Sequence, residues 1–508
     1  MAVTTGSLLL LCLASAHAQG GVPPWTNRYD GPANSGDRAL AIAVDSSGNV
    51  FVTGGSVGDG LEDYETIKYS AAGVPLWTNR YDGPANDVAT AIAVDSSGNV
   101  FVTGLSVGNG LEDYATIKYS NAGVSLWTNR YDGPGNHFDG ACAIGLDSSG
   151  NVFVTGTSHK NASNPYDPDY LTIKYSNGGV PLWTNRFDGR GNGPDDASAI
   201  AVDSSGNVFV TGRSFSSSDS VNADYATVAY SSAGELLWSN FYNGPENLSD
   251  SATAIAVDTS GNVFVTGISE NNASEPFADP DYATIKYSNA GVPLWTNRYT
   301  GPVNGYDSAN AIALDRSGNV LITGASWNGT NYDYATLEYS NAGVPLWTNR
   351  YNGPGNGHGS AARAIAVDSS GNVFVTGESK AANGGYGYAT VAYSNSGVPL
   401  WTNRYDGIEN GVKAIAVDSS GNVIATGLSW NDGYEDYVTI KYSSSVPPPV
   451  HLDFQLLSNE LVLSWTNAGL NLQSAPAITG TFTNLPGATI PYTNPLTAPQ
   501  QFFRLKGN

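Results

Sequence analysis

Twelve residues, AVDSSGNVFVTG, begin at Ala43 and recur without a change at Ala93. Six versions with few substitutions follow, beginning at Gly145, Ala201, Ala256, Ala313, Ala366 and Ala416. A unit written eight times at intervals of ~53 residues indicates an array of like elements that bury their apolar faces against one another. This repeat limits the fold more than any other feature of the chain.

Each unit contains four segments typical of β-strands. In the second copy they are TAIAVD, NVFVTG, DYATIKYS and GVSLWTNRYDG. Alternation predicts that Val100 and Val102 face one side of the sheet while Phe101 and Thr103 face the other. The intervening DSSGN is typical of a tight turn, with Gly98 at the position that requires a positive φ. Four antiparallel strands per repeat predict the blade of a β-propeller.

The repeated pattern resembles the bacterial β-propeller repeat family called SBBP from Gly21 to Ser445. The family name implies seven blades, but eight units are present, and we follow the count in this chain. Each unit contributes one aspartate that opens the turn: Asp45, Asp95, Asp147, Asp203, Asp258, Asp315, Asp368 and Asp418. Each also contributes one fourth-strand tryptophan: Trp25, Trp77, Trp127, Trp183, Trp238, Trp295, Trp347 and Trp401.

The phase of the repeat predicts how the ring closes. The chain starts with a fourth strand around Trp25 and leaves the repeat after a third strand, Asp436 to Ser443. The first strand would therefore complete the last blade and remove the exposed sheet edges. We predict an all-β protein with an eight-bladed propeller of four-stranded blades, closed by the N-terminal strand, and a small C-terminal β domain. A seven-bladed ring with one unit displaced is the alternative.

Two composition shifts predict the remaining segments. An apolar run, Ser7 to Ala14, precedes the small-residue pattern Ala16-His17-Ala18 and is typical of a secretory signal peptide. Three consecutive prolines break the repeat near its end, and the last residues, QQFFRLK, resemble the small β modules that close many secreted bacterial proteins. The predicted segments are a signal peptide (1–18), the propeller (19–445), a Pro-rich linker (446–452) and a C-terminal β module (453–508). The expected location is secreted or at the cell surface.

The charge of the chain argues against a nucleic-acid partner, and its cysteine content argues against disulfides. With 22 basic and 45 acidic residues, the net charge of −23 would repel a nucleic acid, and no apolar segment is long enough to span a bilayer. Cys142 is the only cysteine outside the signal peptide, so disulfides cannot stabilise the fold, and a buried, inert thiol is expected there. We predict a monomer held together by packing.

Length variation is confined to two links in each unit. The link from the second to the third strand runs from nine residues (Gly54 to Asp63) to fourteen (Gly267 to Asp281), and the link between blades also varies. In an up-and-down blade these two links emerge at the same face. Loops of varied length on a rigid scaffold favour ligand binding there, for a glycan or an extracellular protein. Neutral drift of loops without a function is the alternative.

One position on that face varies in chemical type between fixed neighbours. After the repeated Ser of TG-x-S stand Val57, Val107, His159, Phe215, Glu270, Trp327, Lys380 and Trp430. Aromatic rings flanked by amides and carboxylates suit a sugar, and the acidic chain favours neutral or cationic glycans. The candidate ligand-binding residues are Trp327, Trp430, His159, Phe215, Asn328, Tyr332, Asn431 and Tyr434. The alternative is that the two tryptophans only shield their own loops.

The sequence carries no motif for catalysis or for a metal site. His-E-x-x-His, paired Cys-x-x-Cys and Gly-x-Ser-x-Gly in a strand–turn–helix setting are all missing, so no catalytic residue, metal ligand or cofactor is predicted. Acidic clusters at 59–64, 166–170 and 277–282 leave Ca²⁺ as an alternative, although turn formation explains them more simply.

The segment GVPLW is similar to the tryptophan-docking segments of quinoprotein dehydrogenases, which implies that these tryptophans staple neighbouring blades. We therefore expect a non-catalytic binding or scaffold protein. The alternative is a propeller enzyme, either quinoprotein-dehydrogenase-like or polysaccharide-degrading.

Overall fold

The computed structural model describes residues 23–443 and 453–507 apart from short gaps: 59, 109–110, 136, 161–166, 192, 217–221, 272–278, 355–358, 382–383, 407–409, 432, 458–459, 465–469, 478–480, 486–487 and 496–501. The chain divides into two compact units, Met1–Ser444 and Ser445–Asn508. The predicted signal peptide (1–18) and linker (446–452) lie outside the described residues. Among the described residues no helix is present that could cross a membrane.

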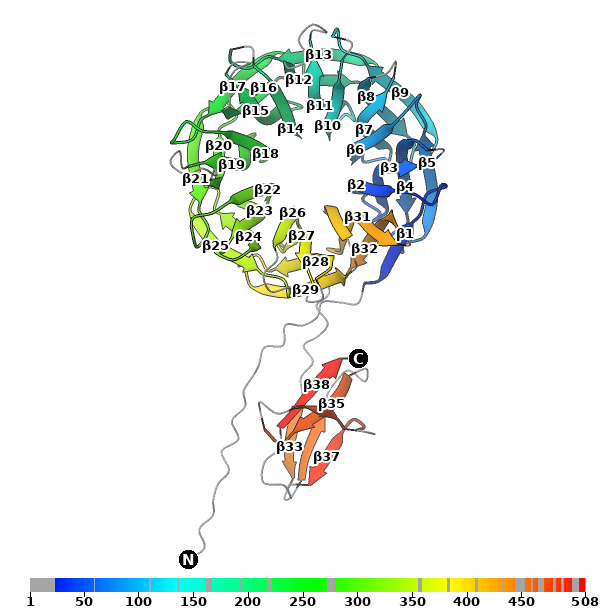
Figure 1. Ribbon diagram of the computed structural model, residues 1–508, viewed down its shortest axis with the longest axis vertical. Helices are drawn as coiled ribbons and strands as arrows, with labels where there is room; N and C mark the ends of the chain where they lie inside the picture. Colours follow the sequence, from blue (N-terminus) through cyan, green and yellow to red (C-terminus); the bar gives the residue numbers. More distant parts are fainter. Residues whose placement is uncertain are drawn as a thin grey trace, which may run out of the picture. The chain divides into compact units, whose positions relative to one another are not determined.

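The first unit is a ring of eight four-stranded antiparallel sheets (Figure 1). The first strands, which surround the centre of the ring, are β2 (Asp37–Val44), β6 (Asp87–Val94), β10 (Asp139–Leu146), β14 (Asp195–Val202), β18 (Asp250–Val257), β22 (Asp307–Leu314), β26 (Ser360–Val367) and β30 (Asn410–Val417). The second strands are β3 (Val50–Val57), β7 (Val100–Val107), β11 (Val152–His159), β15 (Val208–Phe215), β19 (Val263–Glu270), β23 (Val320–Trp327), β27 (Val373–Lys380) and β31 (Val423–Asn431).

The third strands are β4 (Glu62–Tyr69), β8 (Glu112–Tyr119), β12 (Pro168–Tyr175), β16 (Ala223–Tyr230), β20 (Pro280–Tyr287), β24 (Tyr332–Tyr339), β28 (Tyr386–Tyr393) and β32 (Tyr434–Tyr442). The outer fourth strands are β5 (Pro75–Tyr81), β9 (Ser125–Tyr131), β13 (Pro181–Phe187), β17 (Leu236–Tyr242), β21 (Pro293–Tyr299), β25 (Pro345–Tyr351) and β29 (Pro399–Asp406), with β1 (Trp25–Tyr29) in the last blade. Blade 1 is β2 to β5, later blades follow in chain order, and blade 8 is β30 to β32 with β1.

The N-terminal strand closes the ring, as predicted. Strand order in blade 8 is β1-β32-β31-β30, and β1 pairs antiparallel with β32 in the register Trp25↔Lys441 to Tyr29↔Tyr437. Strands from the two ends of the propeller sequence thus share one sheet, and blade 8 gains the outer strand that every other blade makes locally. The eight-bladed count and the closure are both confirmed.

The turn between the first and second strands follows from its sequence. One carboxylate oxygen of Asp95 accepts from the backbone N–H groups of Ser97 and Asn99, each at 2.9 Å, and the other accepts from the Asn99 side chain at 2.8 Å. Gly98 has a φ of 78°, which a residue with a Cβ adopts only with strain. The same aspartate-capped turn holds this hairpin at the opposite face from the variable links.

The core lies between blades. Val100 and Val102 pack against Phe51 and Tyr64 of blade 1, whereas Phe101 joins the cluster shared with blade 3, so the predicted alternation is confirmed. Fourth-strand tryptophans fill the same wedges, and the Trp77 indole N–H donates to the Asn121 carbonyl of the next blade at 3.1 Å. These tryptophans staple neighbouring blades, and the fold is a set of eight similar interfaces.

Cys142 is less buried than expected, although its thiol is unreactive as expected. The residue is half-buried on β10, and its thiol donates to the Ala197 carbonyl of blade 4 at 3.2 Å. Burial raises the pKa of the thiol to about 12, so the reactive thiolate is disfavoured.

The second unit is a small β module with six described strands. These are β33 (Asp453–Leu457), β34 (Glu460–Ser464), β35 (Leu470–Ala475), β36 (Thr483–Asn484), β37 (Tyr492–Pro495) and β38 (Phe502–Gly507). They form two three-stranded sheets, ordered β33-β34-β37 and β36-β35-β38. Leu463 and Leu472 form the buried centre of this module, so its core is small.

Candidate functional site

The two variable links of each unit lie at the same end of the propeller, which we call the variable face. The backbone N–H of Val57, at the end of β3, donates to Gly36 in the link between blades at 3.2 Å. The same contact joins Trp327 to Tyr306 at 3.3 Å. Side chains from both kinds of link therefore border one surface, as the spacing of the repeat predicts.

The eight variable residues after TG-x-S occupy equivalent places on this face. Each stands at or next to the end of a second strand and pairs with a residue at the start of the third strand, for example Val57 with Glu62 and Trp327 with Tyr332. In blade 8 both strands extend by one residue, so that Trp430 pairs with Glu435 and Asn431 with Tyr434. The predicted ring of positions that vary in residue type is therefore present.

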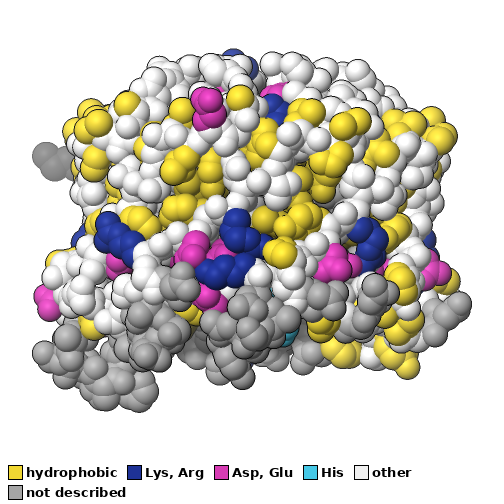
Figure 2. Space-filling model, turned by 90° about the horizontal axis from the view of Figure 1, so that it is seen from above, with side chains coloured by type: hydrophobic (Ala, Val, Ile, Leu, Met, Phe, Trp, Pro, Cys, Tyr) yellow, Lys and Arg dark blue, Asp and Glu magenta, His cyan; other side chains and the backbone are white. Residues whose placement is uncertain are grey.

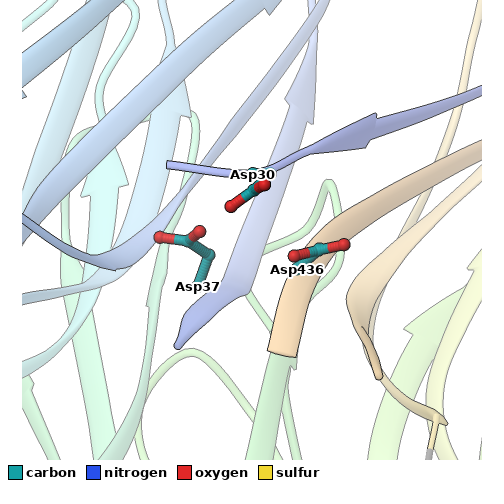
Figure 3. Close-up of side chains that lie close together, drawn as sticks. All are labelled: Asp30, Asp37 and Asp436. Carbon is teal, nitrogen blue, oxygen red and sulfur yellow. The ribbon is translucent and has the colours of Figure 1, made fainter. Parts of the chain in front are cut away.

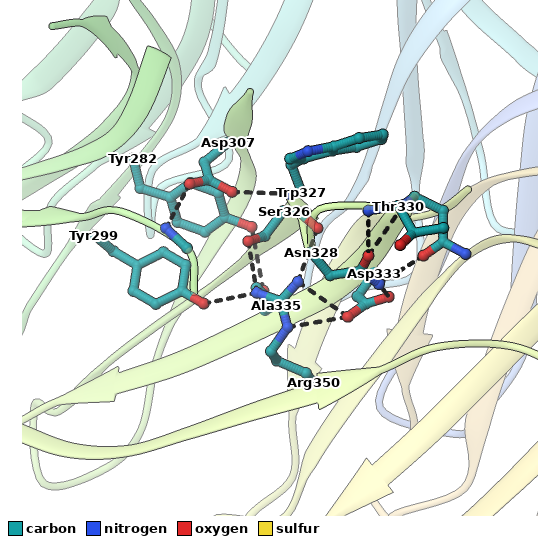
Figure 4. A network of polar contacts seen from close by, with 12 residues as sticks. Tyr282, Tyr299, Asp307, Ser326, Trp327, Asn328, Thr330, Asp333, Ala335 and Arg350 are labelled. Carbon is teal, nitrogen blue, oxygen red and sulfur yellow. Dashed lines mark hydrogen bonds and ion pairs between the residues drawn. The ribbon is translucent and has the colours of Figure 1, made fainter. Parts of the chain in front are cut away.

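The Trp327 side chain packs against its neighbours and is half-buried (Figure 4). Its backbone N–H donates to Asp307 at 3.0 Å, and its ring meets Tyr332 edge-on at 5.1 Å between centroids. The Tyr306 ring also meets the Tyr332 ring edge-on, at 6.1 Å between centroids. A Cβ added to Gly305 would lie 2.3 Å from the Trp327 indole, so the indole packs directly on that backbone. The result is a cluster of three aromatic rings at the variable face of blade 6.

Asn328 shapes the loop beside this cluster. Its side-chain oxygen accepts from the N–H groups of Thr330 and Asn331 at 2.9 and 3.0 Å, and its amide nitrogen donates to Asn331 and Asp333 at 2.6 and 2.8 Å. Because both the oxygen and the nitrogen of its side-chain amide are hydrogen-bonded within the loop, Asn328 stabilises the turn and is not available to a ligand.

Blades 7 and 8 continue the aromatic surface. Trp430 is 38% exposed and Tyr434 is 46% exposed, and Asn431 between them is exposed as well. On blade 7, Tyr386 is 41% exposed, with the Lys380 ammonium 5.4 Å from its ring centre. Asp432 lies outside the described residues.

Among the described residues, all four exposed aromatic side chains belong to this one region: Tyr306, Tyr386, Trp430 and Tyr434. Together with the half-buried Trp327 and Tyr332 they form what we call the aromatic arc, which extends over the variable face of the three consecutive blades 6, 7 and 8. Sequence reasoning named four of its six members and missed Tyr306 and Tyr386. Both stand at the edges of variable links, where a tyrosine in place of a small or polar residue was the available signal.

Two other predicted residues do not join the arc. His159 is only 7% exposed, with its Nδ1 2.6 Å from the Phe138 carbonyl and its ring tilted against that of His137 at 4.7 Å between centroids. Phe215 is half-buried, and the Arg213 guanidinium lies 5.6 Å from its ring centre. These residues belong to blades 3 and 4, across the ring from blades 7 and 8 (Figure 1).

A belt of ion pairs supports the variable face, and sequence reasoning missed it. Arg350 on β25 donates to Asp333 at 3.0 Å, to the Ser326 hydroxyl and carbonyl at 2.6 and 2.9 Å, and to the Tyr299 hydroxyl of blade 5 at 3.0 Å (Figure 4). Equivalent arginine–aspartate pairs recur in other blades: Arg28–Asp436, Arg80–Asp63, Arg130–Asp113, Arg186–Asp169 and Arg298–Asp281. In Figure 2 charged side chains gather in a band near one end of the disc. The aspartate of DY and the arginine of TNRY are therefore structural partners.

Three seams bring three aspartates together, each set within 4.8 Å: Asp30, Asp37 and Asp436; Asp113, Asp132 and Asp139; Asp169, Asp188 and Asp195. Figure 3 shows the first set. Carboxylate oxygens suit Ca²⁺. However, Arg28 pairs with Asp436 at 2.8 Å, and the Gly31 N–H donates to Asp37 at 2.6 Å. One oxygen of Asp37 thus has a protein donor and Asp436 has a cationic partner, and we assign this set to the seam between blades; the second oxygen of Asp37 is buried without a hydrogen-bond partner among the described residues.

Burial of the first-strand aspartates predicts a pH-dependent stability. Burial raises the pKa of Asp195 to about 7 and that of Asp250 to about 6, although backbone N–H groups donate to both. Because the folded-state pKa lies above the unfolded value near 4, their contribution to stability is complete below pH ~4 and is lost as the pH rises towards 7. We expect the Tm to be about 2–5 °C lower at pH 8 than at pH 5.

The substitution Asp195→Asn should reduce this slope and raise the Tm at pH 8, because the amide oxygen still accepts from Gly189 without carrying a charge. Asp82→Asn at an exposed position is the control. Thermal unfolding followed by circular dichroism between pH 4 and 8 measures both, and equal slopes in the wild type and Asp195→Asn would contradict the assignment.

Comparison with known proteins identifies the repeat. The profile of the family described as SBBP, β-propeller repeat, matches residues 77–112 and 357–385. Two segments of the chain therefore match this β-propeller repeat. No curated protein matches the sequence.

Several solved structures are similar to this chain at low sequence identity. Sqt1 from Chaetomium thermophilum matches with a TM-score of 0.51 and 11% identity over 82% of this chain and 97% of that one. Sqt1 bound to the N-terminus of ribosomal protein L10 matches with a TM-score of 0.51 and 12% identity over 82% and 98%. The periplasmic gluconolactonase PpgL of Pseudomonas aeruginosa matches with a TM-score of 0.41 and 11% identity over 73% and 96%. The similarity to Sqt1 supports the propeller fold and carries no ligand over to this chain.

Proposed function

We propose that this SBBP-repeat protein is a secreted or cell-surface, non-catalytic binding protein that holds a neutral glycan against the aromatic arc. The observation that carries the proposal is the gathering of all four exposed aromatic side chains of the described residues on blades 6 to 8. Aromatic rings left in water cost free energy, and a sugar ring covers them with its apolar C–H face.

The polar groups around the arc complete such a site. Asn431 is exposed beside Trp430, and the Tyr386 and Tyr434 hydroxyls belong to exposed rings, so amide and phenol groups are available to sugar hydroxyls. The net charge of −23 repels anionic ligands at long range, which favours a neutral chain over a uronate.

Three aspartates beside the arc are engaged by protein groups, which supports binding without chemistry. Asp307 accepts from the Trp327 and Gly301 N–H groups, and Asp333 pairs with Arg350. Asp436 pairs with Arg28. Acids held in this way position the loops and are not free to transfer a proton to a substrate.

The test is a glycan array followed by isothermal titration of the best neutral ligand. The double variant Trp430→Ala, Tyr434→Ala is expected to weaken binding by about 100-fold, because each exposed ring contributes about tenfold when it stacks on a sugar. The matched control is Leu61→Ala, Leu111→Ala, which removes apolar side chains of similar exposure from blades 1 and 2.

Two results would contradict the proposal. One is an array without any bound glycan while the protein is folded. The other is a double variant Trp327→Ala, Trp430→Ala that binds as tightly as the wild type, which would assign both tryptophans to loop packing.

A further inference from the structure

Five seams between blades hold a lysine ammonium among oxygen atoms, an arrangement that we call the cation cage. Lys68 Nζ donates to the Asn121 carbonyl of the next blade at 3.0 Å and lies 4.9 Å from the centre of the Phe51 ring. The ammonium also meets the aspartate that caps the turn between the first and second strands, as Lys441 meets Asp418 at 2.8 Å. The carbonyl bond recurs from Lys118, Lys174, Lys286 and Lys441 to Asn177, Ser232, Asn341 and Ala71.

Blade 6 has a carboxylate where these five blades have the ammonium. Glu338 stands in the register of Lys68, and its partners across the sheet are Leu321 and Trp347. Leucine also replaces the phenylalanine that lies beneath the ammonium in blade 1. Glu338 is only 3% exposed, and its Oε2 has no hydrogen-bond partner within the described part of the chain. A buried carboxylate oxygen without a partner is destabilising, so this position calls for a cation or a donor.

The aspartate of the cage is kept beside Glu338. Asp315 caps its turn, and its Oδ2 accepts from the Asn319 side chain at 2.9 Å. The equivalent oxygen of Asp418 accepts from its own turn asparagine at 2.8 Å and still meets the Lys441 ammonium, so an oxygen engaged in this way can also bind a cation. Burial is the largest cause that raises the pKa of Glu338, and the Asp315 charge raises it further. Two carboxyl groups are therefore held close together in blade 6.

The carbonyl of the cage belongs in this seam to Asn395 of blade 7. Asn349 donates to the Gly397 carbonyl at 2.7 Å, so the turn that contains Asn395 lies where its equivalents lie in the other seams. In blade 1 the tryptophan and the lysine both donate to this carbonyl. In blade 6 the Trp347 Nε1 has no hydrogen-bond partner among the residues that the structure describes, and the lysine is replaced by Glu338. The Asn395 carbonyl thus receives neither of the two bonds.

We propose that Glu338, Asp315 and the Asn395 carbonyl bind Ca²⁺, which joins blades 6 and 7 as the lysine joins neighbouring blades elsewhere. Charge selects a divalent ion: lysine and aspartate cancel in the other cages, whereas Glu338 and Asp315 carry two negative charges that one divalent cation balances. Two carboxylates and a neutral carbonyl oxygen are ligands that suit Ca²⁺, and water completes its coordination. The site lies at the opposite face from the aromatic arc and is independent of the ligand proposed there.

The test uses Glu338→Lys, which supplies the residue that five other blades carry at this position. Isothermal titration of the whole chain with CaCl2 is expected to show one bound ion fewer in this variant than in the wild type. Ca²⁺ at about 100 times its Kd should raise the Tm of the wild type by about 3 °C and that of the variant by less than about 1 °C. In EDTA the variant is expected to melt above the wild type, because its ammonium pairs with Asp315.

Glu235→Lys is the matched control, because it makes the same change of charge at an exposed position in a turn of the same face. It is expected to keep both the bound ion and the rise in Tm. Equal melting of the wild type in CaCl2 and in EDTA overturns the proposal. A Glu338→Lys variant that still binds as many ions as the wild type also overturns it, because the ion would then lie elsewhere. KCl that raises the Tm as much as CaCl2 at equal ionic strength overturns the choice of a divalent ion.

Discussion

A propeller that lacks residues 19–36 is expected to aggregate or to lose more than about 10 °C in Tm. The deletion removes β1, whose five residues pair with β32, and leaves β32 as an exposed sheet edge. It also removes Trp25 and Tyr29 from the cluster between blades 8 and 1, and Arg28 from Asp436. Loss of one large aromatic side chain from a core costs about 3–5 kcal/mol. The deletion removes several side chains from one seam, so it lowers the free energy of unfolding by more than a single such mutation.

The control is removal of the C-terminal module, residues 453–508, which belong to the separate second unit. That deletion takes away more residues and is expected to leave the Tm of the propeller unchanged. Differential scanning calorimetry and analytical ultracentrifugation measure both outcomes. A chain without 19–36 that stays monomeric and melts with the wild type would show that closure by β1 does not stabilise the ring.

The ring could be predicted from sequence because its determinants are local and repeated. The turn at Asp95 to Asn99 specifies its own hydrogen bonds, and the alternation of Val100, Phe101 and Val102 specifies which neighbour each side chain meets. Closure followed from phase alone, since a fourth strand without a preceding third strand must pair with the third strand left over at the other end. Eight copies make each of these local signals unambiguous.

The candidate site could be predicted only in part, because exposure depends on residues from other strands and other blades. Asn328 and Asn431 occupy similar places in the sequence, yet the first is engaged by Thr330, Asn331 and Asp333 while the second is exposed. His159 was predicted at the surface on the basis of its position after TG-x-S, but contacts with His137 and Phe138 from the preceding link bury it. No spacing rule within one unit encodes such contacts.

The arginine–aspartate belt was missed for the same reason. Asp333 and Arg350 are adjacent across strands β24 and β25, but the hydroxyl that completes the arginine's contacts comes from Tyr299 in blade 5. The sequence repeats DY and TNRY in most units without showing that they meet. Their meeting explains why the variable loops can differ in length above a constant base.

Substitution of Arg350 by methionine is expected to lower the Tm by about 3–6 °C, the second largest effect after loss of β1. Methionine keeps much of the packing volume but removes the bonds to Asp333, Ser326 and Tyr299. The Asp333 side chain is only 7% exposed, so its carboxylate would remain buried, with the Asn328 amide still donating to it (Figure 4). Breaking a buried ion pair on one side costs about 3 kcal/mol or more.

Arg316→Met is the matched control, because Arg316 is an exposed arginine in the turn at the opposite face and is expected to change the Tm by less than about 1 °C. The double variant Arg350→Met, Asp333→Asn should recover part of the loss, since it removes the buried charge that the single variant leaves unpaired. If Arg350→Met melts within 1 °C of Arg316→Met, the belt does not stabilise the blades. If the double variant is no more stable than the single one, the cost comes from lost hydrogen bonds to Ser326 and Tyr299, and the uncompensated Asp333 charge is not its cause.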